Sequence, residues 1–258
     1  MTFPPRCLLA GLLTSGALAQ EAVLDAIGPY EPVYFLFQPQ PLTAKFQYSL
    51  AVRLIAPPVG AEPVLGRRDG LYVSYSQTSL WDLHGESKPF FDNSYRPECW
   101  YHYTIPDRFL AHAAIEGGSG HESNGRDGPL SRSFNHVFLR PILVQDLSQE
   151  WHLDLHPRVK AYVTDLSENP DIARYRGYVD VEAAITHTNG LGLAFQGRMG
   201  NEWDRSSLQA DLTYPLTSIT RGWVSAFLHV QAFQGWGETL RGYNEHTSRG
   251  LVGVSFVR

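Results

Sequence analysis

The sequence has 258 residues, of which 26 are acidic and 21 are basic, and its formal net charge is -5 at pH 7 with histidine neutral. This balance provides no basic surface for nucleic acid, so we exclude nucleic acid as a partner. Aromatic residues make up 12% of the chain, yet the mean hydropathy of -0.23 resembles that of a soluble protein. A barrel that encloses polar side chains and shows apolar ones to lipid would combine these two properties.

The first residues predict a secretory signal peptide. Arg6 precedes a short apolar run, and small residues up to Ala19 end the segment, as a cleavage site requires. We therefore expect residues 1–19 to be a signal peptide and residues 20–258 to form one domain. Cleavage would leave Cys99 as the only cysteine, so the mature chain cannot form an internal disulfide.

Hydrophobic residues recur mostly with a period of two, which predicts β-strands. In the segment 44–55, AKFQYSLAVRLI, apolar side chains alternate with polar ones such as Lys45 and Arg53, and the segment 150–163 alternates in the same way. Similar segments lie near residues 32–38, 70–81, 95–105, 108–122, 131–141, 175–187, 190–202, 206–216, 222–233 and 247–257. We expect about twelve strands, many near the roughly 9 to 11 residues that a tilted strand needs to cross a bilayer.

The polar face of these predicted strands carries long charged side chains, whereas a soluble sandwich shows short polar ones to water. They are Lys45, Arg53, Asp154, Arg158, Lys160, Asp180, Glu182, Arg198 and Asp211. A hydrogen-bonded barrel lumen has this composition. The sequence therefore predicts an all-β fold, a twelve-stranded antiparallel transmembrane β-barrel. The alternative is a soluble secreted sandwich, which would be extracted without detergent.

Residues 121–135 read HESNGRDGPLSRSFN and connect the fifth and sixth predicted strands. With a periplasmic N-terminus, odd-numbered strands run outward, so this connection lies on the extracellular side. Alternate residues share one face of a strand. His121 and Ser123 therefore point toward lipid on the fifth strand, and Asn135 points the same way on the sixth.

Serine, histidine and asparagine can serve as a nucleophile, a base and an orienting group. Ser123 would attack a carbonyl carbon, and His121 would take the hydroxyl proton and return it to the leaving group. Asn135 would hold the imidazole tautomer. Spacing alone leaves a second interpretation open, in which the three residues form a polar rim above the membrane, because serine and asparagine are common turn formers.

The same stretch resembles the signature H-D-S-N-G-R-S-D-P-x-S-R-S-W-N of the outer membrane phospholipase A family. The resemblance continues in family order through PYEPVYFL, KFQYSLA, QTSLW, SKPF, NPDIARYRGY, TYPLTSIT and GWGETLRGYN, over nearly all of the mature chain. It implies a barrel enzyme that hydrolyses acyl esters of phospholipids and lysophospholipids, a phospholipase of A1 and A2 type. By position in the motif, Ser123 is the nucleophile, His121 the base and Asn135 the orienting residue.

The resemblance also implies calcium as a cofactor. Its ligands would be the carbonyl oxygen of Arg126, together with Ser131 and Ser87, the last supplied by the partner subunit of an active homodimer. Calcium accepts neutral oxygens of this kind together with water. The chain departs from the family pattern after Arg126, where Asp127 and Gly128 replace serine and aspartate, so the carboxylate moves by one position.

One further polar residue is expected on the lipid-facing side. Gln77 shares a strand face with Val73 and Trp81, and parity alone leaves open that its amide simply reaches toward the polar edge of the membrane. The resemblance places an interface glutamine here, which implies that paired Gln77 side chains meet across the dimer. The family likeness also implies location in the bacterial outer membrane, with the active site on the side of the extracellular leaflet. The alternative function is a catalytically inactive outer membrane barrel with a pore or structural role.

Overall fold

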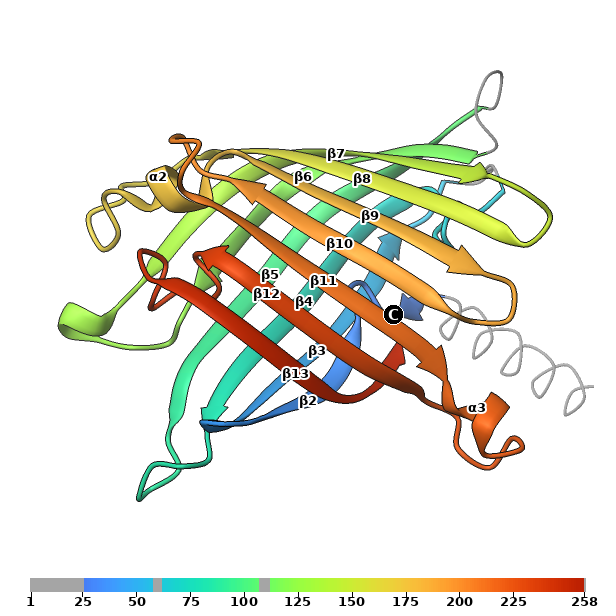
Figure 1. Ribbon diagram of the computed structural model, residues 1–258. Helices are drawn as coiled ribbons and strands as arrows, with labels where there is room; N and C mark the ends of the chain where they lie inside the picture. The colour runs from blue at the N-terminus through green and yellow to red at the C-terminus, as the bar shows by residue number, and fades with distance from the viewer. Residues whose placement is uncertain (1–25, 58–61, 107–111, 258) are drawn as a thin grey trace, which may run out of the picture.

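The computed structural model describes residues 26–57, 62–106 and 112–257, and the predicted signal peptide lies outside these residues. The described chain forms a closed antiparallel barrel of twelve strands (Figure 1). The strands are β2 (Val33–Pro39), β3 (Leu42–Ile55), β4 (Gly70–Asp82), β5 (Phe90–Ile105), β6 (His112–Ser123), β7 (Ser133–Asp146), β8 (Trp151–Tyr162), β9 (Val179–His187), β10 (Gly192–Met199), β11 (Ser206–Pro215), β12 (Phe227–Trp236) and β13 (His246–Val257). Pairing of β13 with β2 closes the ring.

The predicted barrel is confirmed, but several strands differ from their predicted ranges. The strand β10 covers Gly192–Met199 where 190–202 was predicted, and β12 begins at Phe227 where a start near 222 was predicted. The start of the predicted segment 108–122 lies outside the described residues. The sequence pattern predicts a strand over 175–187, but β9 begins at Val179 and a short helix, α2 (Ile172–Arg176), precedes it. Gly177 follows the helix with a φ of 49°, and a Cβ there would lie 1.7 Å from the carbonyl oxygen of Met199. Because only glycine fits such a position, the chain turns here before the strand begins.

The other helical elements are also short. The 3-10 turn η1 (Gly128–Leu130) lies between β6 and β7, and α3 (Leu216–Ile219) follows β11. None of the helices in the described ranges has the length and apolar composition needed to span a membrane.

Side chains alternate across the barrel wall as the sequence predicts. On β3, Tyr48 and Leu50 are 43% and 49% exposed, whereas Lys45, Gln47 and Ser49 are 5%, 9% and 7% exposed. In a barrel with a wall one strand thick, the exposed apolar face is the outside and the buried polar face is the lumen. The outer wall therefore presents apolar side chains, as a wall in contact with lipid would.

Charged side chains of the lumen form ion pairs with one another. Lys160 Nζ lies 2.6 Å from Asp180 Oδ2 on the neighbouring strand, and Arg158 Nη2 lies 2.5 Å from Glu98 Oε1 on β5, across the lumen. A buried charge is tolerated only when it is paired or hydrogen-bonded. The long charged residues in the sequence therefore form the internal scaffold of the barrel.

Residues 29–32 turn into the lumen between two stretches of strand. Both β1 (Ile27–Gly28) and β2 pair with β3, and the segment between them leaves the barrel wall. The Tyr30 ring stacks against Trp100 with ring centroids 4.8 Å apart, and the guanidinium group of Arg140 lies 4.8 Å from the Tyr30 ring. Stacking and cation–π contacts hold this segment inside the barrel.

The two ends of the barrel carry different loops. Loops 83–89, 124–132, 163–178, 200–205 and 237–245 gather at one end, on the left in Figure 1, which we call the site end. The opposite end carries α3 and the end of β13.

Candidate active site

The pairing of β6 with β7 brings the candidate catalytic residues together at the site end. His121 and Asn135 are opposite each other in the strand register, and Ser123 is opposite Ser133. His121, Ser123 and Asn135 are all half-buried. An antiparallel hairpin thus makes neighbours of two residues that are 14 positions apart in the chain.

A hydrogen bond joins His121 to Asn135, with Nδ1 and Oδ1 2.7 Å apart. The amide oxygen carries no proton, so Nδ1–H is the donor. The unprotonated nitrogen of the neutral ring is then Nε2. This tautomer leaves Nε2 free to accept a proton from another group.

Ser123 lies two residues along β6 from His121, on the same face of the strand. The rise of a strand separates two such residues by about 7 Å. Within the described part of the chain, no hydrogen bond joins the Ser123 hydroxyl to His121. Catalytic hydrogen bonds are often long in an enzyme without substrate and shorten when substrate binds.

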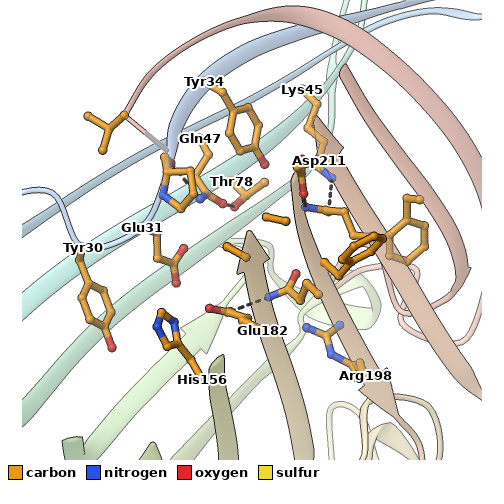
Figure 2. A pocket seen from close by; sticks show the side chains of 18 of the residues that line it. Tyr30, Glu31, Tyr34, Lys45, Gln47, Thr78, His156, Glu182, Arg198 and Asp211 are labelled. Atoms are coloured by element: carbon orange, nitrogen blue, oxygen red, sulfur yellow. Dashed lines mark hydrogen bonds between the residues drawn. The ribbon is translucent and has the colours of Figure 1, made fainter. Parts of the chain in front are cut away.

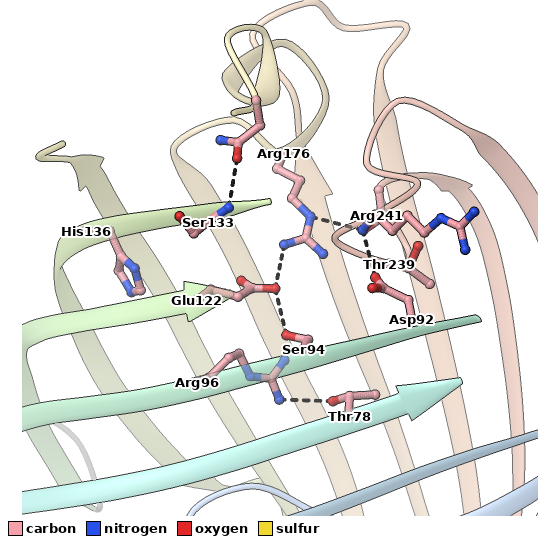
Figure 3. Close-up of polar contacts among 12 residues, drawn as sticks. Thr78, Asp92, Ser94, Arg96, Glu122, Ser133, His136, Arg176, Thr239 and Arg241 are labelled. Atoms are coloured by element: carbon pink, nitrogen blue, oxygen red, sulfur yellow. Dashed lines mark hydrogen bonds and ion pairs between the residues drawn. The ribbon is translucent and has the colours of Figure 1, made fainter. Parts of the chain in front are cut away.

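The carboxylate of Glu168 links Ser131 and Ser133, which lie where the β6–β7 loop leads into β7. Ser131 Oγ donates to Glu168 Oε1 at 2.9 Å, and Ser133 Oγ donates to Glu168 Oε2 at 2.8 Å. The main-chain N–H of Ser133 donates to Asn169 Oδ1 at 3.1 Å (Figure 3). These three hydrogen bonds therefore join the β8–β9 loop to the end of the β6–β7 loop and the first residue of β7.

The sequence reasoning above did not select Glu168. The family-like block NPDIARYRGY begins at Asn169, directly after it, and a carboxylate beside such a block is the signal that could have found it. The contacts of Glu168 reach 37 and 35 positions back along the chain, to Ser131 and Ser133. No periodic pattern in the sequence encodes a contact of this kind.

The other two predicted calcium ligands lie at the same end of the barrel. The guanidinium group of Arg126 donates to the carbonyl oxygen of Phe90 at 2.8 Å, and Ser87 lies in the exposed turn just before Phe90. The structure does not bring Ser87 into contact with Ser131. Among the described residues there is no group of three or more His, Cys, Asp or Glu side chains arranged to hold a metal. The available donors at this end are oxygens, which fit the ligand chemistry of calcium.

Glu122 lies between His121 and Ser123 in the sequence, and its side chain points into the lumen (Figure 3). Its carboxylate accepts hydrogen bonds from Arg176 Nη1 and Ser94 Oγ, both at 2.8 Å. Arg176 is the last residue of α2. The ion pair therefore ties the end of β6 to the β8–β9 loop from inside the barrel.

Gln77 lies on the outer wall, on β4. The hydroxyl groups of Tyr48 and Tyr75 donate to Gln77 Oε1, the second at 3.0 Å, and Gln77 Nε2 donates to Ser79 Oγ at 3.0 Å. Gln77 thus has hydrogen-bond partners within its own chain. A second chain would have to compete with these bonds to pair with it.

A cavity of about 630 Å³ lies in the lumen, between Glu31, His156 and Glu182 (Figure 2). Its wall includes Glu122 but none of the three candidate catalytic side chains. The cavity and the candidate active site therefore lie on opposite faces of the barrel wall.

The family model for phospholipase A1 matches residues 27–256. The chain belongs to the phospholipase A1 family. Phospholipase A1 of Escherichia coli strain K12 is 32% identical over 214 residues, which cover 81% of this chain and 68% of that protein. The enzyme of Klebsiella pneumoniae is 31% identical over 214 residues, with the same coverage. The family predicted from the HESNGRDGPLSRSFN motif is confirmed.

Solved structures of this family share the barrel. The outer membrane phospholipase A of E. coli superposes with a TM-score of 0.74 at 27% identity, covering 90% of this chain and 91% of that chain. The outer membrane phospholipase of Salmonella typhi, solved as a dimer with bound calcium, gives a TM-score of 0.73 at 27% identity, over 90% and 92%. Membership of the phospholipase A1 family makes this chain an outer membrane β-barrel and a phospholipase of the ester hydrolase class.

Proposed function

We propose that this phospholipase A1 family member is a calcium-dependent enzyme that cleaves the acyl esters of phospholipids and lysophospholipids, with A1 and A2 activity, through Ser123, His121 and Asn135. The observation that carries the proposal is the hydrogen bond of 2.7 Å between His121 and Asn135 on the same outer face as Ser123. A solved E. coli relative is an active-site mutant with alanine in place of asparagine; it is 26% identical, with a TM-score of 0.74 over 90% of this chain and 91% of that chain. That relative supports a catalytic part for asparagine.

In this mechanism His121 Nε2 removes the proton of the Ser123 hydroxyl as Ser123 Oγ attacks the ester carbonyl carbon. The C–O bond to the glycerol breaks, and His121 returns the proton to the leaving alcohol oxygen. Water then cleaves the acyl group from Ser123, with His121 again acting as the base. Asn135 keeps the proton on Nδ1 throughout, and the main-chain N–H of Ser123 donates to the negatively charged oxygen.

Calcium, when bound, supplies positive charge near the developing oxyanion. The carbonyl oxygen of Arg126 and the hydroxyl of Ser131 would hold it from the β6–β7 loop, and Ser87 of the partner subunit would complete the set. Glu168 joins this proposal because its carboxylate already lies within 2.9 Å of the Ser131 hydroxyl. A carboxylate beside neutral oxygens is the combination that calcium sites use.

The active form in this proposal is a homodimer, since Ser87 would come from a second chain and Gln77 would meet its counterpart across the interface. The Salmonella typhi relative, which is a dimer with bound calcium, supports this arrangement. The site end would face the cell exterior, with His121 and Ser123 at the level of the outer leaflet. Phospholipid would then reach Ser123 from the lipid phase.

Replacement of the proposed nucleophile tests the function. We expect Ser123→Ala to lower phospholipid hydrolysis on the order of 10⁴-fold or more, measured with a fluorescent phospholipid in mixed micelles. Ser119→Ala is the matched control, because Ser119 is an exposed serine on the same face of β6. Both variants should migrate on unheated gels as folded barrels. Wild-type hydrolysis by Ser123→Ala would exclude this serine as the nucleophile.

The same hydrolysis assay distinguishes the proposed phospholipase from the second candidate function. An inactive barrel with a pore or structural role would hydrolyse no phospholipid with Ser123 intact. Conductance in a planar bilayer would then be the measurement that identifies a pore.

A further inference from the structure

Asn124 follows the proposed nucleophile and is 1% exposed. Its Oδ1 accepts the main-chain N–H of Arg126 at 3.2 Å and that of Arg132 at 3.0 Å, and its Nδ2 donates to the carbonyl oxygen of Leu130 at 2.9 Å. Its own main-chain N–H donates to the carbonyl oxygen of Arg132 at 3.1 Å. A single buried residue thus binds both limbs of the β6–β7 loop.

These bonds lie directly beside the two loop groups proposed to hold calcium. Arg126, whose N–H is held by Asn124, carries one proposed ligand on its own carbonyl oxygen. Ser131, which carries the other, lies between Leu130 and Arg132, and both of these are also held by Asn124. The side chain of Asn124 therefore fixes the separation of the two proposed ligands from within the loop.

Ordering a loop when a metal binds costs conformational entropy, and a loop that is already ordered avoids that cost. The loop between Asn124 and Arg132 contains Gly125 and Gly128, both in the left-handed region with φ of 64° and 56°. Glycines in this region give an unrestrained loop many accessible backbone conformations. The hydrogen bonds of Asn124 restrict the loop to few of them.

We infer that Asn124 is a positioning residue that sets the calcium affinity of this loop, by holding the Arg126 carbonyl oxygen and the Ser131 hydroxyl in place before calcium binds. The inference rests on the proposed function and concerns the binding of calcium, while bond cleavage stays with Ser123 and His121. Residues that orient metal ligands typically contribute about 10- to 100-fold in metal affinity.

The test compares Asn124→Ala with Asn189→Ala in the full chain in detergent. Asn189 is a matched control because its Oδ1 also accepts a main-chain N–H, that of Leu191 at 2.9 Å, in a turn at the opposite end of the barrel. Calcium binding is measured by titration calorimetry, and kcat is measured over a calcium series. We expect Asn124→Ala to raise the calcium Kd by about 10- to 100-fold, whereas the Kd of Asn189→Ala should equal that of the wild type. Excess calcium should restore the kcat of Asn124→Ala to the wild-type value.

Several outcomes would overturn the inference. A Kd for Asn124→Ala within about threefold of the wild-type value would do so, since residues that orient metal ligands contribute more than this. A kcat that stays low in saturating calcium would also do so, because it would indicate a general structural defect.

Folding is checked by gel migration before and after heating. If Asn124→Ala does not fold, Asn124→Leu replaces it, because leucine fills a similar volume and removes the same hydrogen bonds; the same rise in Kd is expected. Failure of the inference differs from failure of the proposed function. A wild-type protein that binds no calcium and hydrolyses lipid in excess chelator contradicts both, whereas a calcium-dependent wild type with an unaltered Asn124→Ala contradicts only the inference.

Discussion

His121 Nδ1 and Asn135 Oδ1 lie 2.7 Å apart across the β6–β7 pair, on the outer wall of the barrel. The bond determines which ring nitrogen carries the proton and in which direction the other nitrogen points. Asn135 itself contributes no atom to the bonds that form and break. Its loss should therefore weaken catalysis without removing the proposed nucleophile or the proposed base.

Asn135→Ala should lower kcat on the order of 10- to 1000-fold, less than Ser123→Ala, because only the orientation of His121 is lost. Asn135→Asp is the matched control, since it keeps an acceptor opposite Nδ1 and should retain more activity than the alanine variant. Steady-state hydrolysis of a fluorescent phospholipid gives both values. An Asn135→Ala variant as inactive as Ser123→Ala would mean that Asn135 does more than orient His121.

Glu168→Gln should raise the calcium Kd by about tenfold, because the side chain keeps its size and loses its charge beside Ser131. Glu150→Gln, at an exposed turn of the opposite end, is the control and should bind calcium as the wild type does. Titration calorimetry measures both. Equal calcium Kd values for the two variants would remove Glu168 from the proposed site.

Gln77→Leu should weaken the proposed dimer by about 1 kcal/mol, the usual contribution of a hydrogen bond between side chains within a membrane. Tyr48→Phe should leave the dimer as strong or stronger, because it removes a bond that holds Gln77 within its own chain. Sedimentation equilibrium in detergent with calcium present measures the dissociation constant. An unchanged constant for Gln77→Leu would place the interface elsewhere.

Glu238 lies in the loop after β12, and its ion pairs should make the free energy of unfolding depend on pH. Burial raises the pKa of Glu238, but Lys45 and Arg249 lower it by more, so the pKa lies below its ordinary value. Lys45 Nζ and Arg249 Nε lie 3.3 Å and 2.9 Å from its carboxylate. A carboxyl group with a lowered pKa adds stability above the unfolded value of about 4.3 and loses it as the pH falls through the folded pKa.

Glu238→Gln should therefore lower the free energy of unfolding by about 2 to 4 kcal/mol near pH 7, since the buried Lys45 and the half-buried Arg249 lose the carboxylate that pairs with them. The difference from wild type should shrink below about pH 4 as the wild-type carboxylate becomes protonated. Urea unfolding in lipid vesicles over a pH series measures it. A difference that stays constant from pH 7 to pH 3 would contradict this account.

Alternation in the sequence predicted the strands, and the long charged side chains on their polar face favoured a barrel over a soluble sandwich. Parity then decides which wall residues face the lumen. Lys45 is buried and Leu50 is exposed, as their positions on one strand require. The same parity predicted a common face for His121 and Ser123. The outward orientation is a property of the strand, so it could be predicted without any knowledge of tertiary contacts.

Contacts between loops could not be predicted in this way. Ser131 and Glu168 meet although 37 positions separate them, and Glu168 lies outside the periodic segments. The turn of residues 29–32 into the lumen was not predicted either, because the sequence pattern indicates a strand only from about residue 32. Pro29 and Pro32 were the available signal, since proline cannot donate a hydrogen bond to a strand ladder.

The stack of Tyr30 on Trp100 occupies the interior of the barrel, and His121 with Ser123 lies on the exterior. The candidate active site therefore lies on the outside of the barrel, whereas a soluble esterase encloses its substrate in a pocket. In the proposed function, the surrounding membrane would be both the solvent of the protein and the source of ester, and substrate would reach Ser123 by lateral diffusion within one leaflet. Lipid composition and packing around the wall would then control turnover in the way that a substrate pocket does elsewhere.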